Sequence, residues 1–362
     1  IGGIVGYLNQ KHRLSWGATF SHVPYGYSNF FAFYDTARID GELNYVYNLD
    51  QYILREFDDA LTGIVYYPLS RVYRVEGGLG ITFVNYSYVD QRATYMIDAF
   101  GNPTYLVSEQ NFKLPAPKGY QYGTVSLAFV ADNSKFGFTS PLDGYRYRIE
   151  TDGIVGPFKF GTLLTDFRAY KYVKPVSFAA RVIHYGRYFG DANDPNTISP
   201  LTVGADFFVR GYNTYSFDYS EVPANADGST PEIDRLYGSK IGVLNMEVRL
   251  PVTGPREIAP IKSLAFPSTL QFFFDGGMAW SNATPSLKFT TDYDELTTNP
   301  TRIPVFSAGA SLRVNILGAF VLEGYYAIPF QRPLRDPFNN SSSAKANRIS
   351  NGVFGLLLYP GW

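Results

Sequence analysis

The sequence predicts an all-β fold, a transmembrane antiparallel β-barrel, from its composition, its two-residue alternation and its pattern of connections. The 362-residue chain contains 30 tyrosines and 29 phenylalanines, yet its mean hydropathy is −0.12. It has no run of about 18 apolar residues, so a helical span is excluded, whereas a membrane strand needs only about 9 to 11 alternating residues. Because only helices and closed barrels satisfy every backbone group in lipid, a barrel is the remaining membrane fold.

The clearest alternation lies in four segments, residues 238–250, 269–280, 305–316 and 319–329. Successive side chains of a strand point to opposite faces, so each segment predicts one polar and one apolar face. The polar faces carry these residues: Asn245, Glu247, Arg249, Gln271, Asp275, Gly277, Ser307, Ser311, Arg313, Asn315 and Glu323. We expect the apolar faces to meet lipid and the polar faces to line a lumen. A large soluble all-β protein is the alternative.

The sequence also predicts strands along the rest of the chain. The full set is 2–9, 13–22, 52–67, 71–88, 119–131, 145–153, 161–173, 176–189, 238–250, 269–280, 305–316, 319–329 and 351–362. Tight turns and long connections mostly fall on opposite ends, the long ones being 89–118, 190–237, 281–304 and 330–350. This asymmetry is typical of a bacterial outer-membrane barrel, with short turns in the periplasm and long loops outside.

The strand count is odd. It is thirteen as it stands, or fifteen if residues 28–49 form another hairpin. A closed antiparallel barrel in a single bacterial chain needs an even number, so we expect a natural total of 16, with one or more strands preceding Ile1. Residues 1–362 are therefore predicted to be one outer-membrane barrel domain that is partial at its N-terminus.

The longest connection, about residues 190–237, contains Val209, Arg210, Gly211 and Tyr212 in succession. The next two strands place Glu247 and Asp275 on their polar faces, and these strands are adjacent and antiparallel. The two carboxylates need a cation that neither strand clearly supplies. An arginine from the preceding loop meets this need because its planar fork binds carboxylates bidentately. Gly211 allows a tight turn beside it.

This constellation resembles the Omp85 superfamily of outer-membrane assembly and translocation barrels, which includes BamA, TamA and the two-partner secretion transporters. The resemblance implies an inward-folded sixth extracellular loop whose tip docks on the next two strands, with Arg210, Glu247 and Asp275 as a structural latch. Val209, Gly211 and Tyr212 match the loop motif, and Phe273 and Gly277 match the strand motif. The match is firmest over residues 201–362, and residues 68–76 resemble barrels fused behind a TolB-like propeller.

The final strand resembles the aromatic C-terminal signal by which such barrels are inserted. The residues that carry this resemblance are Phe354, Leu356, Leu358 and Trp362. Pro360 and Gly361 interrupt the strand before its end, and proline cannot donate a ladder hydrogen bond. Two interpretations stay open, a weakly paired seam that opens sideways and an ordinary frayed terminus.

Two classes of function follow from this interpretation. The first is insertion, assembly or translocation of proteins through a lateral seam, with outer-membrane lipids, client polypeptides and associated periplasmic or lipoprotein subunits as partners. The second is a passive pore or an anchor for a fused or associated periplasmic domain. The client and the N-terminal region cannot be deduced from this sequence.

An enzyme is not expected. The chain has no cysteine and only three scattered histidines, and it shows no Gly-x-Ser-x-Gly, His-Glu-x-x-His or phosphate-binding glycine motif. No metal or other cofactor is predicted. The 31 basic and 32 acidic residues give no bulk attraction to nucleic acid, which is not an expected partner.

Overall fold

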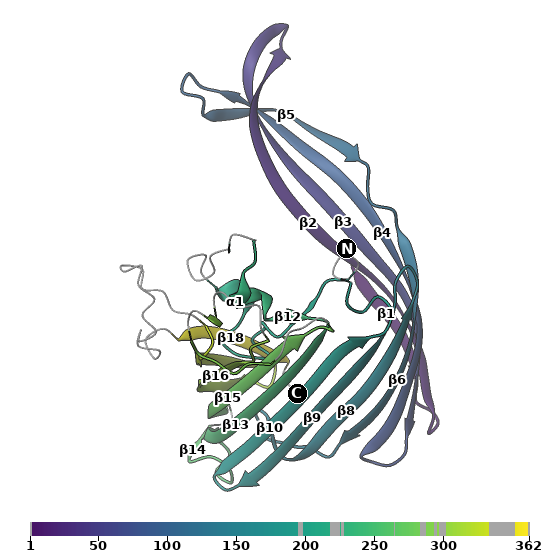
Figure 1. Cartoon of the computed structure of the whole chain (residues 1–362), viewed down its shortest axis with the longest axis vertical. Helices are drawn as coiled ribbons and strands as arrows, with labels where there is room; N and C mark the ends of the chain where they lie inside the picture. Colours follow the sequence, from purple (N-terminus) through teal and green to yellow (C-terminus); the bar gives the residue numbers. More distant parts are fainter. Residues whose placement is uncertain are drawn as a thin grey trace. The chain divides into compact units, whose positions relative to one another are not determined.

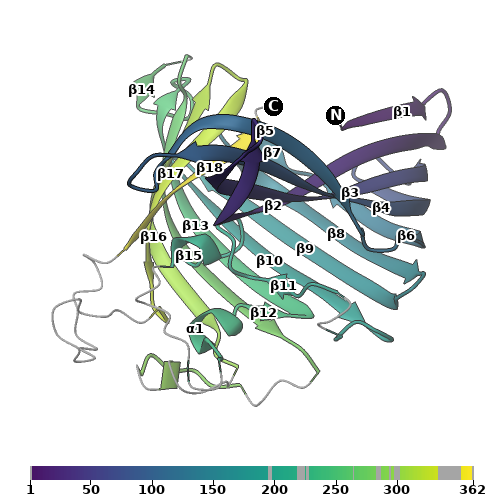
Figure 2. The same ribbon diagram turned by 90° about the horizontal axis from the view of Figure 1, so that it is seen from above.

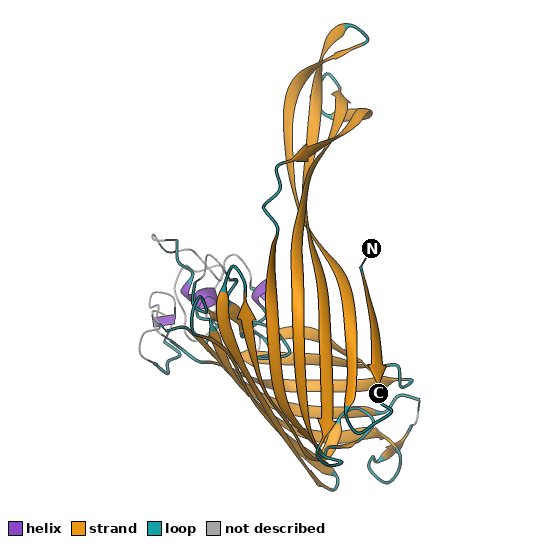
Figure 3. Cartoon of the chain, turned by 90° about the vertical axis from the view of Figure 1, so that its right-hand side faces the viewer, coloured by secondary structure: helices purple, strands orange, loops and turns teal. Residues whose placement is uncertain are grey.

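The structure is a computed structural model, and it describes residues 2–194, 198–217, 225, 228–263, 265–282, 287–292, 295–296, 302–332 and 352–360. Almost all of the regular structure in these ranges is strand (Figure 3). None of the helices in these ranges has both the length and the apolar character needed to cross a bilayer.

One sheet of 16 strands contains nearly the whole described chain. Thirteen of its strands form a continuous path in the order β1-β2-β3-β4-β6-β8-β9-β10-β13-β15-β16-β17-β18, and β5, β7 and β14 attach to β4, β8 and β13. The path strands are β1 Gly3–Asn9, β2 Ser15–Ile39, β3 Glu42–Pro68, β4 Tyr73–Ile97, β6 Tyr120–Asp132, β8 Pro141–Val155, β9 Lys159–Val173, β10 Val176–Tyr188, β13 Lys240–Gly254, β15 Ser268–Trp280, β16 Val305–Ile316, β17 Phe320–Pro329 and β18 Val353–Pro360. These correspond one to one with the thirteen predicted strands, so the all-β antiparallel prediction is confirmed. The prediction that strands precede Ile1 stays a prediction.

The minor elements lie in the connections. They are β5 Pro103–Leu114, β7 Lys135–Phe136, β14 Ile261–Lys262, the separate pair β11 Leu201–Thr202 and β12 Tyr237–Gly238, the 3₁₀ turn Thr214–Ser216 and the helix α1 Pro231–Asp234. By contacts, the chain divides into two compact units. Unit 1 comprises residues 1–66, 77–125 and 154–157, and unit 2 comprises residues 67–76, 126–153 and 158–362.

In unit 2, strands β8, β9, β10 and β13 run side by side (Figure 2), and β15 to β18 continue the sheet. Along β13 to β17, polar and charged side chains are buried and apolar side chains are exposed, which is the opposite of the pattern in a soluble protein. Gln271, Asp275 and Glu323 are fully buried, whereas Met246 and Phe272 are about half exposed. A sheet that buries its charges and exposes its apolar side chains is stable only where the apolar face meets a non-aqueous environment.

In unit 1, the strands run much further than predicted. Strands β2, β3 and β4 contain 25, 27 and 25 residues (Figure 1), and β5 pairs with the far part of β4. The alternative count of fifteen, in which residues 28–49 form a separate hairpin, is therefore wrong. These residues instead continue β2 and β3, which pair without interruption from Ser15↔Tyr66 to Ile39↔Glu42. Asp40 and Gly41 make the turn between them with positive φ angles of 51° and 89°.

The predicted connection 89–118 is likewise mostly strand. Its tip is the turn at residues 98–102, where the Asp98 carboxylate accepts hydrogen bonds from the backbone N–H groups of Phe100 and Asn102. These hydrogen bonds, with one from the Asn102 side chain, lower the pKa of Asp98.

Candidate functional site

The Arg210 side chain is the centre of the candidate site. Its Nε and Nη2 atoms donate to the two oxygens of Asp275 on β15, at 2.7 and 2.9 Å, which is a bidentate pair. Nη2 also donates to Glu247 Oε1 on β13 at 3.0 Å, and Nη1 donates to Glu323 Oε1 on β17 at 2.9 Å. One loop arginine thus binds carboxylates on three strands that are neighbours or near neighbours in the sheet.

Two further arginines complete what we call the Arg210 cluster, which consists of Arg210, Arg249, Arg313, Glu247, Asp275 and Glu323. Arg249 binds Glu247 Oε2, with 2.8 Å from Nε and 2.6 Å from Nη2. Arg313 Nε donates to Glu323 Oε2 at 2.7 Å, and its Nη2 lies 3.5 Å from Glu247 Oε1. Three arginines therefore face three carboxylates, so the cluster is neutral. Charges this deeply buried are tolerated when they are paired and hydrogen-bonded.

Uncharged amides extend the cluster. Asn245 Nδ2 donates to Asp275 Oδ1 and to the Phe208 carbonyl of the loop, both at 2.8 Å. Gln271 Nε2 donates to Glu323 Oε1 at 2.8 Å. These bonds orient the carboxylates toward the arginine.

The aromatic ring of Phe273 and the glycines Gly277 and Gly211 determine the packing around Arg210. The guanidinium carbon lies 3.6 Å from the centroid of the Phe273 ring, which is a cation–π contact. At Gly277, a Cβ atom would lie 2.5 Å from Val209 Cγ2, so the absence of a side chain there makes room for the loop. Gly211 has a φ of +87°, a conformation that other residues rarely adopt.

The rest of the loop tip lies in an apolar core. Val209 and Tyr212 pack with other buried residues from the loop and the neighbouring strands: Ile183, Val203, Leu236, Ile241, Val243, Ala279 and Val305. The Tyr212 hydroxyl donates to the Phe306 carbonyl at 3.2 Å and accepts from the Gln331 N–H at 2.7 Å. The face of β13 that carries Asn245, Glu247 and Arg249 is apolar toward its start, where the loop covers Ile241 and Val243.

The structure brings together every predicted loop and strand residue of the site, namely Arg210, Glu247, Asp275, Val209, Gly211, Tyr212, Phe273 and Gly277. The sequence interpretation placed Glu323 on a polar face and missed its contact with Arg210. A signal existed for its pairing with Arg313 alone, because the tight turn at Leu317 and Gly318 sets that register. Arg249 and Arg313 were likewise placed on polar faces and were given no part in the latch.

The residues of the predicted C-terminal signal lie mostly on β18. Phe354, Leu356 and Leu358 are exposed on one face of this strand. Pro360 still pairs, opposite Phe320, so the strand is not interrupted before that point. Trp362 and Gly361 lie outside the described residues.

The described side chains give little support for a metal-binding or catalytic site. Across these ranges, His, Asp and Glu form no group of three or more able to hold a metal ion. His184 contacts Tyr188 Oη through Nε2 at 2.5 Å and the Ile241 carbonyl through Nδ1 at 3.0 Å, and it stacks on Trp280. The expectations of no cofactor and no enzymatic activity stay predictions.

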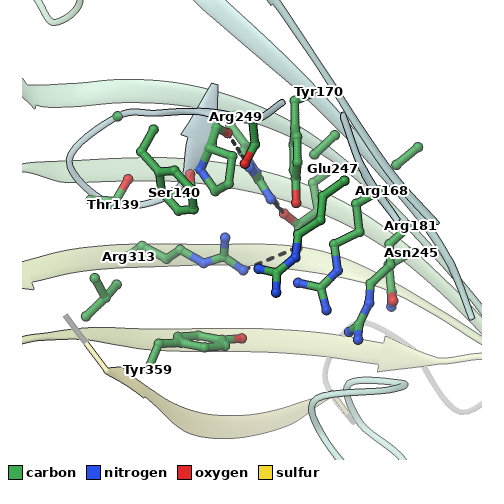
Figure 4. A pocket seen from close by; sticks show the side chains of 18 of the residues that line it. Thr139, Ser140, Arg168, Tyr170, Arg181, Asn245, Glu247, Arg249, Arg313 and Tyr359 are labelled. Carbon is green, nitrogen blue, oxygen red and sulfur yellow. Dashed lines mark hydrogen bonds and ion pairs between the residues drawn. The ribbon is translucent and has the colours of Figure 1, made fainter. Parts of the chain in front are cut away.

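A cavity of about 380 Å³ adjoins the cluster (Figure 4). It lies between the loop tip, represented by Phe207 and Arg210, and a segment at residues 134–141. Six arginines line it: Arg146, Arg168, Arg181, Arg210, Arg249 and Arg313.

Comparison with solved structures finds a similar fold in a structure of BamA. The structure of BamA from Haemophilus ducreyi lacking POTRA domains 1–3 matches with a TM-score of 0.50 and 13% sequence identity, covering 99% of this chain and 70% of that one. CdiB from Acinetobacter baumannii matches with a TM-score of 0.43 and 12% identity, covering 100% of this chain and 56% of that one. No family model and no curated protein matches the sequence. At such low identity the BamA match establishes similarity of fold alone, and it supports the predicted class of antiparallel membrane barrel.

Proposed function

We propose that this chain is an Omp85-type barrel of the bacterial outer membrane that acts in insertion, assembly or translocation of proteins. The observation that carries the proposal is the position of Arg210. A single arginine from the longest loop binds carboxylates on three strands of a sheet that shares its fold with BamA. Outer-membrane lipids, client polypeptides and associated periplasmic subunits are the partners that this role requires.

In this proposal Arg210 is a structural latch and not a catalyst. Each side-chain nitrogen of Arg210 donates to a carboxylate of the same chain, as does its backbone N–H, and the side chain is 5% exposed. It therefore has little capacity to bind a client directly. Its effect is to fix the loop tip against β13, β15 and β17, which keeps the polar face in one arrangement while client strands are handled elsewhere.

The client would be handled at a lateral seam between the first and last strands of the barrel. A strand edge offers unpaired N–H and C=O groups to which an extended client segment can add. Strand β18 is suited to this role because it is short, with eight residues paired to β17.

The alternative is a passive pore or an anchor barrel for a periplasmic domain. It draws support from the charged residues of β4, β8, β9 and β10. However, Arg148 is bound to Glu76 and Glu150, and both Arg168 and Arg181 are bound to Asp166. Charges paired in this way keep the face hydrated and do not by themselves define a permanent conduit.

Assisted folding of a client barrel tests the proposal. The full-length protein is reconstituted in liposomes, a urea-denatured outer-membrane barrel is added, and its heat-modifiable folded form is followed by gel electrophoresis. We expect faster folding than in empty liposomes, a reduced rate with Arg210→Ala, and an unchanged rate with Arg38→Ala, an exposed arginine of β2. Equal rates with and without the protein would favour the pore or anchor.

A further inference from the structure

The connection between β6 and β8 does not behave as an ordinary hairpin turn. From Leu142, at the start of β8, back to Phe138, the chain contacts strands that are increasingly distant from β8 in the sheet. The Leu142 carbonyl accepts from Ser177 Oγ on β10 at 2.9 Å, and the Pro141 carbonyl accepts from Arg249 Nη1 on β13 at 2.9 Å. Thr139 Oγ1 lies 2.7 Å from Thr269 Oγ1 on β15, and the Phe138 carbonyl accepts from Asn315 Nδ2 on β16 at 2.5 Å.

These contacts place the turn across the polar face of unit 2. Strands β8, β9, β10, β13, β15 and β16 are consecutive neighbours in the sheet, so the turn crosses five strand intervals. Neighbouring strands lie about 4.8 Å apart, which makes this path about 24 Å along the sheet. A segment this short can bridge so many strands only over the face on which the sheet curves inward, and this is the face that carries the Arg210 cluster.

The turn and the loop tip are held in different ways. The loop tip buries apolar side chains and a charged network. The turn is held mainly by polar contacts, and the side chains of Phe136 and Phe138 remain about half exposed. Hydrogen bonds give a small net stabilisation compared with burial of an apolar core. Displacing the turn from the sheet therefore costs less free energy than displacing the loop tip.

Between the two segments lies the arginine-lined cavity (Figure 4), whose acidic lining residues are Asp206 and Glu247. The other carboxylates of the cluster, Asp275 and Glu323, lie behind the guanidinium groups and are fully buried. Arg168 and Arg181 share a single carboxylate, Asp166. The surface that an entering ion meets is therefore predominantly cationic, although the charges behind it nearly balance.

We propose that residues 133–143 form a gate over the polar face of unit 2, and that displacement of this gate opens a path selective for small anions such as chloride. The gate is coupled to the loop through three successive contacts. Arg249 binds both the Pro141 carbonyl of the gate and Glu247, and Glu247 in turn binds Arg210. This activity concerns ion passage and does not depend on the handling of client polypeptides.

Two variants test the gate and leave the arginines intact. One loosens the gate, and the other locks it to the sheet. The pair Ser177→Ala and Thr269→Val removes two strand-side hydrogen bonds to the gate with near-isosteric residues. The pair Thr139→Cys and Thr269→Cys can form a disulfide across the 2.7 Å contact, and the chain has no other cysteine. The pair Ser28→Ala and Thr36→Val on β2 is the matched control.

The full-length protein is measured in planar bilayers with a potassium chloride gradient, after heat-modifiability has shown that each variant is folded. We expect Ser177→Ala with Thr269→Val to raise the open probability about tenfold, equivalent to about 1.4 kcal/mol, with a reversal potential on the chloride side. The oxidised cysteine pair should be silent and should regain wild-type openings on reduction.

Three results would overturn the gate. The oxidised pair could conduct like the wild type, the pair could fail to cross-link in folded protein, or the loosened variant could open no more often than the β2 control. A cation-selective or unselective current in the loosened variant would overturn the anion path. All four outcomes are distinct from a failure of the client-folding assay, which measures a different process.

Discussion

At the scale of single residues, Arg210 matters because it has three partners. Its removal leaves Asp275 with no cation, since Arg249 and Arg313 bind the other two carboxylates. Asp275 would keep only its bond from Asn245 among side chains of the described chain. A fully buried carboxylate without a cation costs much more free energy of folding than the intact network contributes to stability.

We expect Arg210→Ala to lower stability by about 3 to 5 kcal/mol, the usual cost of breaking a buried ion pair. The measurement is the temperature at which the folded, heat-modifiable form disappears on a gel. Arg210→Lys should fall between the wild type and the alanine variant, because one ammonium cannot reproduce the bidentate pair with Asp275 and also reach two more acids. A midpoint for Arg210→Ala equal to that of Arg38→Ala would contradict the latch.

Gly277 offers a second test at this scale, through steric fit instead of charge. A Cβ atom there would overlap Val209 Cγ2, so Gly277→Ala should displace the loop tip and destabilise the fold by about 1 to 3 kcal/mol. Val209→Ala removes the overlapping methyl group, so the double variant should be more stable than Gly277→Ala alone. Additive losses in the cycle would show that the two residues do not meet.

At the scale of elements, the extended part of unit 1 has its own charge pair, in which the carboxylate is buried and the arginine is partly exposed. Asp50 on β3 accepts two hydrogen bonds from Arg92 on β4, both at 2.7 Å. The guanidinium also lies over the rings of Phe33 and Phe112, at 5.2 and 5.4 Å. One arginine thus joins β2, β3, β4 and β5.

We expect Arg92→Ala to loosen this region without affecting unit 2. The buried carboxylate would lose its main partner, a cost of about 1 to 3 kcal/mol. Amide hydrogen exchange in residues 28–52 and 88–114 should rise by roughly 5- to 100-fold, while exchange in β13 to β17 should stay unchanged. Arg38→Ala on the same hairpin is the control, and equal exchange in the two variants would exclude the role given to Arg92.

Elements with one face in water and one in lipid could be predicted from sequence because alternation marks them. The strands from β13 to β17 are of this kind, and their order and pairing agree with the prediction. The far parts of β2 and β3 could not be read this way. Much of β2 between Tyr25 and Tyr34 is exposed, so no burial contrast marks its faces. The Asp40-Gly41 turn was nevertheless a local hairpin signal, since both positions adopt positive φ.

Contacts remote in sequence account for the rest of what was missed. The sequence around residue 138 contains no pattern that predicts a hydrogen bond from Asn315 to its carbonyl. The sequence around Ile241 likewise contains no pattern that predicts its coverage by a loop. Glu323 differs, because its place opposite Arg313 follows from a short turn. Its contact with Arg210 additionally requires the loop to cross from β10 to β17, which no local pattern encodes.

At the scale of the whole molecule, the account depends on the long loop returning to the polar face of the sheet. The neutral Arg210 cluster and the apolar core around Tyr212 both describe the same docked tip. If the tip were free in solution, Gly277 would have no steric reason to be glycine and Asp275 would be a buried acid without a cation.

Cysteine cross-linking in native membranes tests this docking most directly. The chain contains no cysteine, so Val209→Cys with Gly277→Cys introduces a single pair at positions where a Cβ atom on residue 277 would lie 2.5 Å from the present Val209 Cγ2. Tyr215→Cys with Gly277→Cys is the control, because Tyr215 lies in the same loop and is almost fully exposed. The account predicts that the first pair forms a disulfide under mild oxidation and resists a membrane-impermeant maleimide, and that the control pair does neither. Free, maleimide-reactive thiols at both positions 209 and 277 would contradict it.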